Sequence, residues 1–440
     1  MSMLLGAIAS DLKQRLLGRP TVGVIGLGYV GLPLAVAFAE SGCDVIGVDL
    51  DEKRAAAVAS GASITEDVTN ERLRAQVTRG GLRVSRDVQP LKDADAVIIC
   101  VPTPLGKSRQ PDVSYIEKAT EDIARILRPG QLIVLESTTY PGTTAEILRP
   151  RLEATGLMAG EQFFLAFSPE RIDPGSRTHR LETIAKVVGG VTPRCQELVA
   201  TLYRRIVEKV VPVSTAQTAE MVKVFENTFR AVNIALVNEF AIMCRRLGIS
   251  VWEVIGAAAT KPFGFMPFYP GPGLGGHCLP SDPHYLSWKL RLEGYEPRFI
   301  AFADDINRQM PGYVVQLAVD ALNDRERSIR GARVLVIGVA YKANVADTRD
   351  TPAVEIIETL RRKGAAVDYH DPHVSAFSVA GATLQSVELA EADLSAWDVV
   401  LVLTAHDLCD WKRIARESSL VIDTRNVTEG MEGSGNVIRL

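Results

Sequence analysis

A glycine-rich turn between a strand and a helix constrains the fold of this chain more than any other stretch. Residues 21–26 (TVGVIG) form a β-branched run, and the residues after them continue to Gly42 with the apolar spacing of a buried helix. A second apolar run, CDVIGVD, ends at Asp49. The sequence therefore predicts a βαβ unit, which is the building block of a parallel sheet covered by helices.

The turn reads GLGYVG from Gly26 to Gly31. Gly26 allows a tight turn, Gly28 lets the backbone approach a pyrophosphate, and Gly31 permits close packing of helix on strand. The N–H groups at the start of the helix would then face the phosphates. Asp49, 23 positions after Gly26, would accept hydrogen bonds from ribose hydroxyls and repel a 2′-phosphate. The pattern predicts NAD as cofactor, although the nearby Arg54 leaves NADP open.

Composition excludes several classes of protein. The chain has 440 residues, 47% of them hydrophobic, which predicts a soluble protein of two to four domains. Its net charge is −4 and it has no basic run, so nucleic acid and anionic membranes are poor partners. No apolar run approaches the roughly 20 residues of a membrane span, and we expect a cytoplasmic protein. The six cysteines are scattered, without a CxxC pair, and the histidines are dispersed, so we expect no disulfide framework and no metal.

Further α/β units follow the first, with polar residues where their strands end. Strands are expected at 95–104, 131–139 and 163–167, and Thr138 and Glu170 would lie at the carboxyl edge of the sheet, where ligands of open α/β folds bind. Glu170 could equally be a solvated loop residue. A stretch of some 30 residues from Gln217, without proline or glycine before Gly248, predicts one long helix suited to a hinge or a dimer core.

Two polar residues on this long helix and one cysteine after it are candidates for catalysis. Lys223 and Asn227 share a helical face, either as part of a solvent-exposed stripe or as donors to a developing oxyanion. Residues 271–282 read GPGLGGHCLPSD, so glycines would let bulky substrate approach Cys278. A lone cysteine is often an inert buried residue, but Asp282 supplies a carboxylate that could orient a thiol or a water.

A third region begins at Arg333 and again alternates strands with helices, but lacks the glycine turn. Lys342 and Arg425, each after an expected strand, could bind one anionic ligand or could be surface residues. The fold class predicted is α/β, with two Rossmann-like parallel-sheet domains joined by a helical middle domain with a long central helix. The boundaries expected are 1–212 for the NAD-binding domain, 213–310 for the middle domain and 311–440 for the C-terminal domain.

Taken together, these stretches resemble the UDP-glucose/GDP-mannose dehydrogenase family from about residue 20 to about residue 427. GLGYVG, VPTP, SPER, GLGGHCLPSD, YKANVADTRDTP and DTRN occur in the family's order. VPTPLGKSRQPDVSY, ESTTYPGTT and GGHCLPSDPHYLSWK are most similar to the bacterial branch that oxidises UDP-N-acetylglucosamine. Branches that act on UDP-N-acetylmannosamine, UDP-N-acetylgalactosamine or UDP-glucose are close relatives, and no single residue separates them by physical argument.

The resemblance implies a four-electron oxidation of the sugar C6 alcohol to a carboxylate, with two NAD⁺ used in succession. Cys278 matches the family nucleophile, which would trap the aldehyde as a thiohemiacetal and then carry a thioester that water hydrolyses. Lys223 and Asn227 match oxyanion-stabilising positions, and Asp282 matches a carboxylate that assists proton transfer. Thr138 and Glu170 match positions implicated in water handling and thioester hydrolysis.

The remaining predictions concern binding and assembly. The cofactor contacts expected are Gly26, Gly28, Tyr29, Val30, Gly31, Asp49, Arg54, Thr103 and Thr138. The substrate contacts expected are Glu170, Arg171, Lys223, Asn227, Gly275, Lys342 and Arg425, the last two matching UDP-sugar contacts of the C-terminal domain. A homodimer or higher homo-oligomer is expected, serving envelope polysaccharide synthesis.

Two departures and two rival functions qualify the resemblance. Where the UDP-glucose branch has a second acidic residue after the SPE glutamate, this chain has residues 173–175 (DPG). His277 precedes the cysteine, but adjacent residues rarely face each other, so it is a poor candidate for a base. A non-catalytic nucleotide-sugar sensor would not need Cys278, Lys223, Asn227 and Asp282 together. A two-electron dehydrogenase would not need the cysteine and would yield one NADH per sugar.

Overall fold

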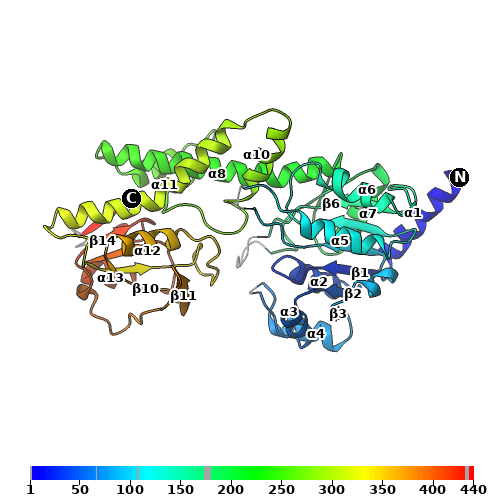
Figure 1. The fold of residues 1–440 in the computed structure, drawn as a ribbon, viewed down its shortest axis with the longest axis horizontal. Helices are drawn as coiled ribbons and strands as arrows, with labels where there is room; N and C mark the ends of the chain where they lie inside the picture. The colour runs from blue at the N-terminus through cyan, green and yellow to red at the C-terminus, as the bar shows by residue number, and fades with distance from the viewer. Residues whose placement is uncertain (1, 66, 107–108, 173–179, 432–435) are drawn as a thin grey trace. The chain divides into compact units, whose positions relative to one another are not determined.

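The computed structural model describes residues 2–65, 67–106, 109–172, 180–431 and 436–440. The chain forms two compact units, residues 1–226 with 284–295 and residues 227–283 with 296–440. Both units contain a mainly or wholly parallel sheet with helices, so the predicted α/β fold class is confirmed (Figure 1). The predicted division into three domains stays a prediction.

The first unit is built on an eight-stranded sheet in the order β3-β2-β1-β4-β5-β6-β7-β8. Its strands are β1 (Thr21–Ile25), β2 (Asp44–Val48), β3 (Leu82–Ser85), β4 (Ala96–Ile99), β5 (Leu132–Leu135), β6 (Phe164–Phe167), β7 (Lys186–Gly190) and β8 (Val210–Val213). All neighbours are parallel except β6 and β7, which pair antiparallel. The predicted βαβ unit is therefore confirmed, whereas the reversal at β7 is a feature that the sequence analysis did not include.

Helices cover both faces of this sheet. They are α1 (Ser2–Leu17), α2 (Gly31–Glu40), α3 (Glu52–Ala59), α4 (Asn70–Thr78), α5 (Ser114–Ala124), α6 (Arg149–Glu153) and α7 (Pro193–Tyr203), with short turns η1 (Gln89–Asp93) and η2 (Thr144–Leu148) and the helix α10 (Asp282–Leu292). On β4, Ala96 and Ile98 pack on the face covered by α1, α2 and α7, while Val97 and Ile99 pack on the face covered by α5. This alternation is the period of two expected of a strand buried on both sides.

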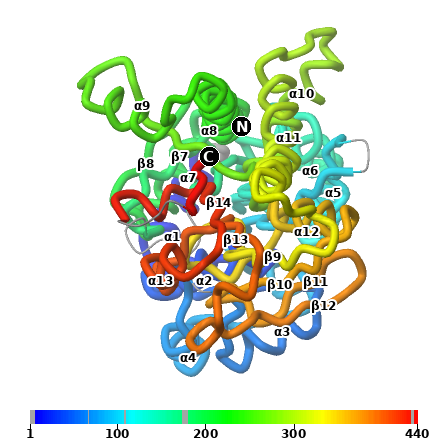
Figure 2. Tube along the Cα trace, turned by 90° about the vertical axis from the view of Figure 1, so that its left-hand side faces the viewer, coloured from blue at the N-terminus to red at the C-terminus, as the bar shows by residue number. Residues whose placement is uncertain are grey.

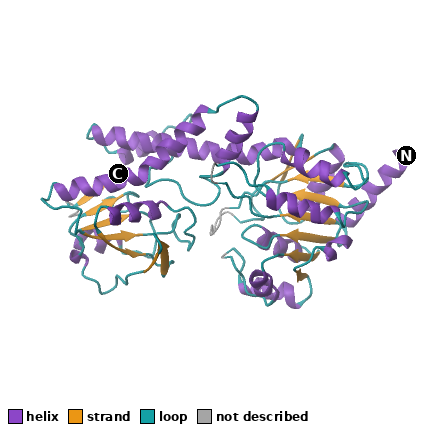
Figure 3. Ribbon diagram, viewed as in Figure 1, coloured by secondary structure: helices purple, strands orange, loops and turns teal. Residues whose placement is uncertain are grey.

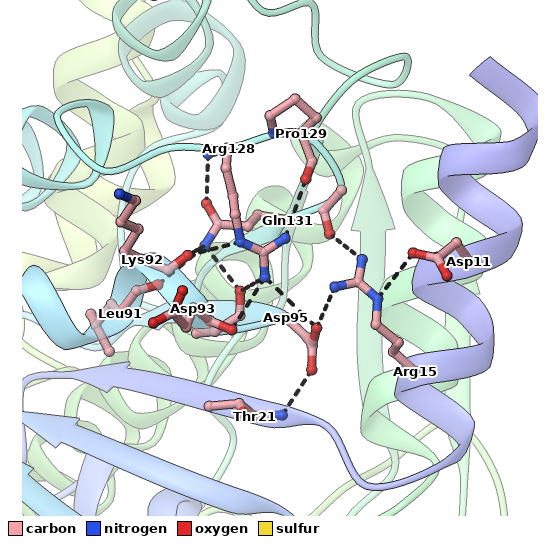
Figure 4. Close-up of polar contacts among 12 residues, drawn as sticks. Asp11, Arg15, Thr21, Leu91, Lys92, Asp93, Asp95, Arg128, Pro129 and Gln131 are labelled. Atoms are coloured by element: carbon pink, nitrogen blue, oxygen red, sulfur yellow. Dashed lines mark hydrogen bonds and ion pairs between the residues drawn. The ribbon is translucent and has the colours of Figure 1, made fainter. Parts of the chain in front are cut away.

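The amino ends of the central strands are fixed by a polar cluster drawn in Figure 4. Asp95 accepts hydrogen bonds from the backbone N–H of Thr21 at 2.9 Å and from the Arg15 side chain at 2.7 Å. Gln131 accepts from the Arg128 backbone N–H at 2.9 Å and donates to three backbone carbonyls, those of residues 91, 92 and 94. These bonds tie α1 and the loop before β5 to the sheet, so this edge has a structural role.

The second unit is built on a parallel five-stranded sheet in the order β10-β9-β13-β14-β15 and a separate hairpin. The sheet contains β9 (Arg333–Ile337), β10 (Ala366–His370), β13 (Val399–Val402), β14 (Val421–Asp423) and β15 (Val437–Arg439). The hairpin, β11 (Ala376–Val379) and β12 (Ala382–Gln385), lies beside β10 through a bridge between Tyr369 and Ser386 (Figure 2). The sequence pattern did not predict this hairpin.

The helices of the second unit include α9 (Val251–Ala258), α11 (Arg298–Asn323), α12 (Pro352–Arg362) and α13 (Trp411–Glu417), with the short turn η3 (Leu394–Ala396). The helix α8 (Ala216–Arg246) belongs to the first unit up to Glu226 and to the second from Asn227. Figure 3 distinguishes the helices and strands of both units by colour. The predicted long helix is confirmed within one residue at each end. Among the described residues, none of the helices combines the length and apolarity needed to cross a bilayer.

Candidate functional site

The turn between β1 and α2 explains its glycines one by one. Gly26 has φ +92°, and a Cβ on it would lie 2.5 Å from the Cys100 carbonyl oxygen. A Cβ on Gly31 would lie 1.8 Å from the Gly26 carbonyl oxygen, so helix and turn are in direct contact there. At Gly28, by contrast, a Cβ would meet no heavy atom of the described chain within 4 Å. Two glycines are therefore required by the fold, and the third leaves open space beside the backbone where a phosphate fits.

Asp49 follows β2 and is 5% exposed. Its carboxylate accepts hydrogen bonds from the backbone N–H groups of Leu27 at 2.8 Å and Asp51 at 2.9 Å, and Arg54 lies 3.2 Å from it. The carboxylate is thus held beside the glycine turn with its negative charge in place, which favours a ribose over a phosphorylated ribose. Because Arg54 pairs with Asp49, its guanidinium also lies close to the position expected for the adenosine ribose.

The other predicted cofactor contacts lie on the same unit. Tyr29 is 45% exposed, and Val30 immediately precedes α2. Thr103 is buried, and its backbone carbonyl accepts a hydrogen bond from the Tyr285 hydroxyl. Thr138 is half-buried after β5, next to Thr139, whose hydroxyl is bonded to that of Thr143 at 2.6 Å. NAD contacts from these residues stay a prediction.

Glu170, after β6, is buried at 8% exposure, so the alternative of a solvated loop residue is wrong. Its Oε1 accepts from the backbone N–H of Arg171 at 2.6 Å and from that of Ile172. Lys223 of α8 is also buried and donates from Nζ to the Glu170 backbone carbonyl at 2.7 Å, so it does not belong to a solvent-facing stripe. Arg171 pairs with Glu226 at 2.6 Å, which occupies the guanidinium that was expected to contact substrate.

A buried lysine and glutamate beside Glu170 were missed by the sequence analysis. Lys186, the first residue of β7, contacts Glu136 and lies 3.6 Å from the Glu170 carboxylate. Tyr203, at the end of α7, donates a hydrogen bond to Glu136. The sequence did contain a signal for them: a charged residue adjoins each of two apolar runs. Glu136 follows LIVL, and Lys186 precedes VVGG.

In the second unit, the structure brings Asn227 and Asp282 together. The Asn227 amide donates to Asp282 Oδ2 at 2.5 Å, and both side chains are buried, at 6% and 2% exposure. Asp282 is the first residue of α10, and its backbone N–H donates to the Cys278 carbonyl at 2.8 Å. Cys278 is half-buried, one turn before this carboxylate. The start of α10 thus carries the Asp282 carboxylate, with the backbone of Cys278 bonded to it and the amide of Asn227 reaching it from α8. A cysteine, a carboxylate and an amide donor are residue types able to carry nucleophilic chemistry.

The glycines before Cys278 are required by close contacts within the second unit, which is not the role expected of them. A Cβ on Gly275 would lie 2.7 Å from Tyr341 Cβ, and one on Gly271 would lie 2.5 Å from the Arg425 guanidinium. At Gly276 the Tyr341 ring would be 2.9 Å away. The space left by the missing side chains is therefore filled by Tyr341 and Arg425, and the interpretation that it admits bulky substrate is wrong at these three positions.

Lys342 and Arg425 lie in loops at the carboxyl edge of the five-stranded sheet. Lys342 is half-buried, five residues after β9, and Arg425 follows β14 and donates from Nε to the Leu403 carbonyl at 2.8 Å. Burial lowers the pKa of Arg425 to about 10, against the attraction of Asp423. The next residue, Asn426, has φ +57°. Contact of Lys342 and Arg425 with an anionic ligand stays a prediction.

Two further positions singled out in the sequence are His277 and residues 173–175. Burial lowers the pKa of His277, with Arg349 adding to the effect, so its neutral form is favoured. Residues 173–175, where a second acidic role was in doubt, lie outside the described residues.

Comparison with known proteins places these features in one family. The chain matches three domain models of the UDP-glucose/GDP-mannose dehydrogenase family: the NAD binding domain at residues 20–207, the central domain at 217–309 and the UDP binding domain at 335–430. It is 42% identical over 357 residues to a UDP-N-acetyl-D-glucosamine 6-dehydrogenase of Pseudomonas aeruginosa, covering 81% of this chain and 83% of that protein. It is 37% identical over 412 residues to a UDP-N-acetyl-D-mannosamine dehydrogenase of Pyrococcus horikoshii, covering 92% and 95%.

A solved structure agrees with this assignment. The UDP-N-acetyl-D-mannosamine dehydrogenase structure from Pyrococcus horikoshii has a TM-score of 0.86 with this chain at 36% identity, covering 95% of this chain and 98% of that one. The matched models account for the glycine turn, the α8 region and the C-terminal sheet. The chain therefore belongs to the UDP-glucose/GDP-mannose dehydrogenase family, and it is an NAD-dependent UDP-sugar dehydrogenase, an oxidoreductase.

Proposed function

We propose that this enzyme oxidises the C6 hydroxyl of a UDP-N-acetylhexosamine to a carboxylate, with UDP-N-acetylglucosamine as substrate and UDP-N-acetylglucosaminuronate as product. The observation that carries the proposal is Cys278 placed one turn before the buried Asn227–Asp282 pair. A dehydrogenase that stopped at an aldehyde or ketone would not need a thiol there. A four-electron oxidation needs one, because the aldehyde must be held between two oxidation steps.

The bond-forming and bond-breaking steps at Cys278 are assigned to groups of this chain. The Cys278 thiolate bonds to the C6 aldehyde carbon, and a proton supplied by Asp282 or water leaves a thiohemiacetal. Lys223 and Asn227 donate hydrogen bonds to oxygens that become negative. After the second oxidation, a water oxygen bonds to the thioester carbon, and Glu170 accepts the water proton. The C–S bond then breaks, which releases the carboxylate product and leaves Cys278 as the thiolate. Thr138 has its proposed place beside this water.

The cofactor fits the first unit. The open space at Gly28, the start of α2 and the Asp49 carboxylate would hold the pyrophosphate and the adenosine ribose. NAD, when bound, accepts the hydride in each of the two oxidations. The chain's own part is to hold the sugar carbon and to move protons, since each oxidation also releases one.

The choice of sugar rests on the relatives. The relative at 42% identity carries the name of a UDP-N-acetyl-D-glucosamine 6-dehydrogenase, whereas relatives at 37% are named for UDP-N-acetyl-D-mannosamine and for an NDP-N-acetyl-D-galactosaminuronic acid. UDP-N-acetylmannosamine, UDP-N-acetylgalactosamine and UDP-glucose are the alternative substrates. The desolvated Arg425 guanidinium, with Lys342, is proposed to bind the uridine diphosphate that all four share.

The test is the amount of NADH formed per sugar when the sugar is limiting. We expect two NADH from UDP-N-acetylglucosamine, and we expect Cys278→Ser to form no acid from it. The other three UDP-sugars, run in parallel, decide the stereochemistry. One NADH per sugar, or full conversion by Cys278→Ser, would contradict the thioester route. No NADH from any of the four sugars, with tight binding retained, would support a non-catalytic sensor instead.

The assembly proposed is a homodimer formed through the second unit. On α8 and at the residue that follows it, the side chains of Phe229, Leu236, Phe240, Met243 and Leu247 are between 41% and 73% exposed. Their spacing of three, four and seven residues puts most of them on one helical stripe. An exposed apolar stripe of this length is typical of a helix that packs on a partner helix.

A further inference from the structure

One buried charged cluster at the carboxyl edge of the eight-stranded sheet has no part in the roles assigned above except through Glu170. The cluster consists of Glu136, Glu170, Lys186 and Tyr203, which are 1%, 8%, 3% and 0% exposed. Two carboxylates and one ammonium are thus removed from water together. Burying charge is costly, and a buried ion pair adds little net stability, so stability alone does not explain an extra carboxylate.

The direction of β7 brings Lys186 to this edge. The strands β4, β5 and β6 end here, and β7 pairs antiparallel with β6 through Phe167 and Gly189. Because of the reversal, the first residue of β7, and not the last, lies beyond the end of β6, where Glu170 follows. Lys186 therefore reaches the region of the candidate catalytic carboxylate from a strand that is paired on both sides, with β6 and with β8.

Lys186 is itself held in place from the other side. Its Nζ donates a hydrogen bond to Glu136 Oε1, and Glu136 Oε2 accepts one from the Tyr203 hydroxyl. The Lys186 Nζ also lies 5.2 Å from the centre of the Tyr203 ring. A lysine side chain is flexible, but here a carboxylate and a ring fix its ammonium group.

The two oxygens of Glu170 differ in their surroundings. Oε1 accepts the backbone N–H groups of Arg171 and Ile172. Oε2 is buried, lies 3.6 Å from Lys186 Nζ, and has no hydrogen-bond partner in the described part of the chain. A distance of 3.6 Å is an ion pair but too long for a hydrogen bond. Oε2 is therefore the atom left to accept a hydrogen from water, with a fixed positive charge beside it.

The pKa directions agree with this geometry. Burial raises the pKa of Glu170, but the Lys186 charge, the Ile172 N–H, the Lys223 charge and the neighbouring Glu136 carboxyl more than offset it, and the pKa stays below its ordinary value. Burial raises the pKa of Glu136 to about 7, in spite of Lys186 and Tyr203. One carboxylate of the cluster is thus kept charged while the other is near its midpoint at neutral pH.

We propose that Lys186, anchored by Glu136 and Tyr203, is a positioning residue that keeps the Glu170 carboxylate ionised and oriented for the hydrolytic step. The inference rests on the proposed role of Glu170 in accepting the proton of the attacking water. Lys186 acts through Glu170 and not on the substrate. Its loss should slow hydrolysis of the thioester and should leave binding of NAD and UDP-sugar unchanged.

The test uses a variant in which the local charge is conserved. Lys186→Met alone leaves two carboxylates without a cation, and such a protein could simply fail to fold. The double variant Lys186→Met/Glu136→Gln removes one positive and one negative charge together and keeps Glu170. Lys186→Arg retains the charge, and Glu170→Gln removes the carboxyl group on which the inference rests. All are assayed as the full-length enzyme with UDP-N-acetylglucosamine and NAD.

The readouts separate positioning from simple damage. For the double variant we expect kcat to fall at least about tenfold, at the low end of what acid–base catalysis supplies, with both KM values unchanged within about threefold. The acid limb of the kcat profile should move to higher pH, because Glu170 loses the cation that lowers its pKa. Mass spectrometry of the quenched enzyme should show acyl-enzyme on Cys278, and Lys186→Arg should restore turnover.

Two outcomes would overturn the ideas separately. If Glu170→Gln accumulates acyl-enzyme but the double variant turns over with a native pH profile, Lys186 has no positioning role and the inference is wrong. If Glu170→Gln itself hydrolyses the thioester at the native rate, the proposed role of Glu170 is wrong, and the inference that rests on it falls with it.

Discussion

Substitution of Gly275 by alanine tests whether the loop before Cys278 is shaped by its contact with Tyr341. A Cβ at this position would lie 2.7 Å from Tyr341 Cβ, 3.1 Å from Pro352 Cδ and 3.2 Å from the Asp350 carbonyl oxygen. None of these atoms is the end of a flexible side chain. The new methyl group cannot be accommodated by a rotamer change, so the backbone of one of the two segments must move.

The size of the effect follows from this geometry. Forcing a methyl group into such a site costs about 1–3 kcal/mol. For a unit of roughly 200 residues, that corresponds to a fall in Tm of about 2–4 °C per kcal/mol. Gly275 is three residues from Cys278, and a misplacement of about 1 Å in a reacting group lowers the rate about 100-fold. We expect a modest loss of stability and a much larger loss of kcat.

The assay is thermal unfolding together with NADH formation for Gly275→Ala and a control. The control is Gly312→Ala, because Gly312 lies within α11 and a Cβ there meets no heavy atom of the described chain within 4 Å. The control should keep its activity and its Tm, or gain slightly, since alanine is favoured over glycine in a helix by about 1 kcal/mol. Adding Tyr341→Ala should not rescue Gly275→Ala, because the nearest atom is the Cβ that alanine retains. Native kcat in Gly275→Ala would refute the reasoning.

Two further predictions concern pH dependence and assembly. Glu220 is fully buried on α8 and accepts hydrogen bonds from Gly142 and Thr144, and burial raises its pKa to about 7. Because the pKa is raised in the folded state, it adds on the order of 3 kcal/mol to the free energy of unfolding below about pH 4.5, and this contribution is lost as pH rises through 7. In urea unfolding, Glu220→Gln should lack this fall in the free energy of unfolding with pH. The same fall in the variant as in the parent protein would contradict the assignment. Phe240→Glu should convert the proposed dimer to a monomer in sedimentation velocity, whereas the neighbouring exposed Glu239→Gln should not; a monomeric parent protein would contradict the proposal.

The parts of the fold that could be predicted are those determined by local pattern. The strand, glycine turn and helix from Thr21 to Glu40 are encoded by a β-branched run, a required φ of +92° at Gly26 and an apolar helix. The long helix α8 was predictable because its 31 residues contain no glycine or proline. The edge positions of Glu170 and Arg425 followed from the same rule, since polar residues after buried strands gather where parallel strands end.

The parts that could not be predicted depend on long-range contacts. The antiparallel β7 has the same apolar, β-branched composition as its parallel neighbours, so its direction leaves no trace in the sequence. The glycines at 271, 275 and 276 were correctly seen as a stretch without side chains. What fills their space, Arg425 and Tyr341, lies more than 60 residues away in the chain. At these three positions glycine allows a close approach, but the glycine itself does not identify the group that approaches.

The cluster around Lys186 could not be predicted because it depends on the reversed direction of β7. Read locally, Lys186 is a polar residue before an apolar strand, and Glu136 is a polar residue after one, so parallel pairing would place them at opposite edges of the sheet. The antiparallel pairing of β6 and β7 places both at the carboxyl edge, where Lys186 contacts Glu136 and lies 3.6 Å from the Glu170 carboxylate. A single reversal of strand direction therefore supplies a cation to an edge at which the parallel strands end in carboxylates. That is why a lysine with no motif of its own is the residue best placed to control the charge of Glu170.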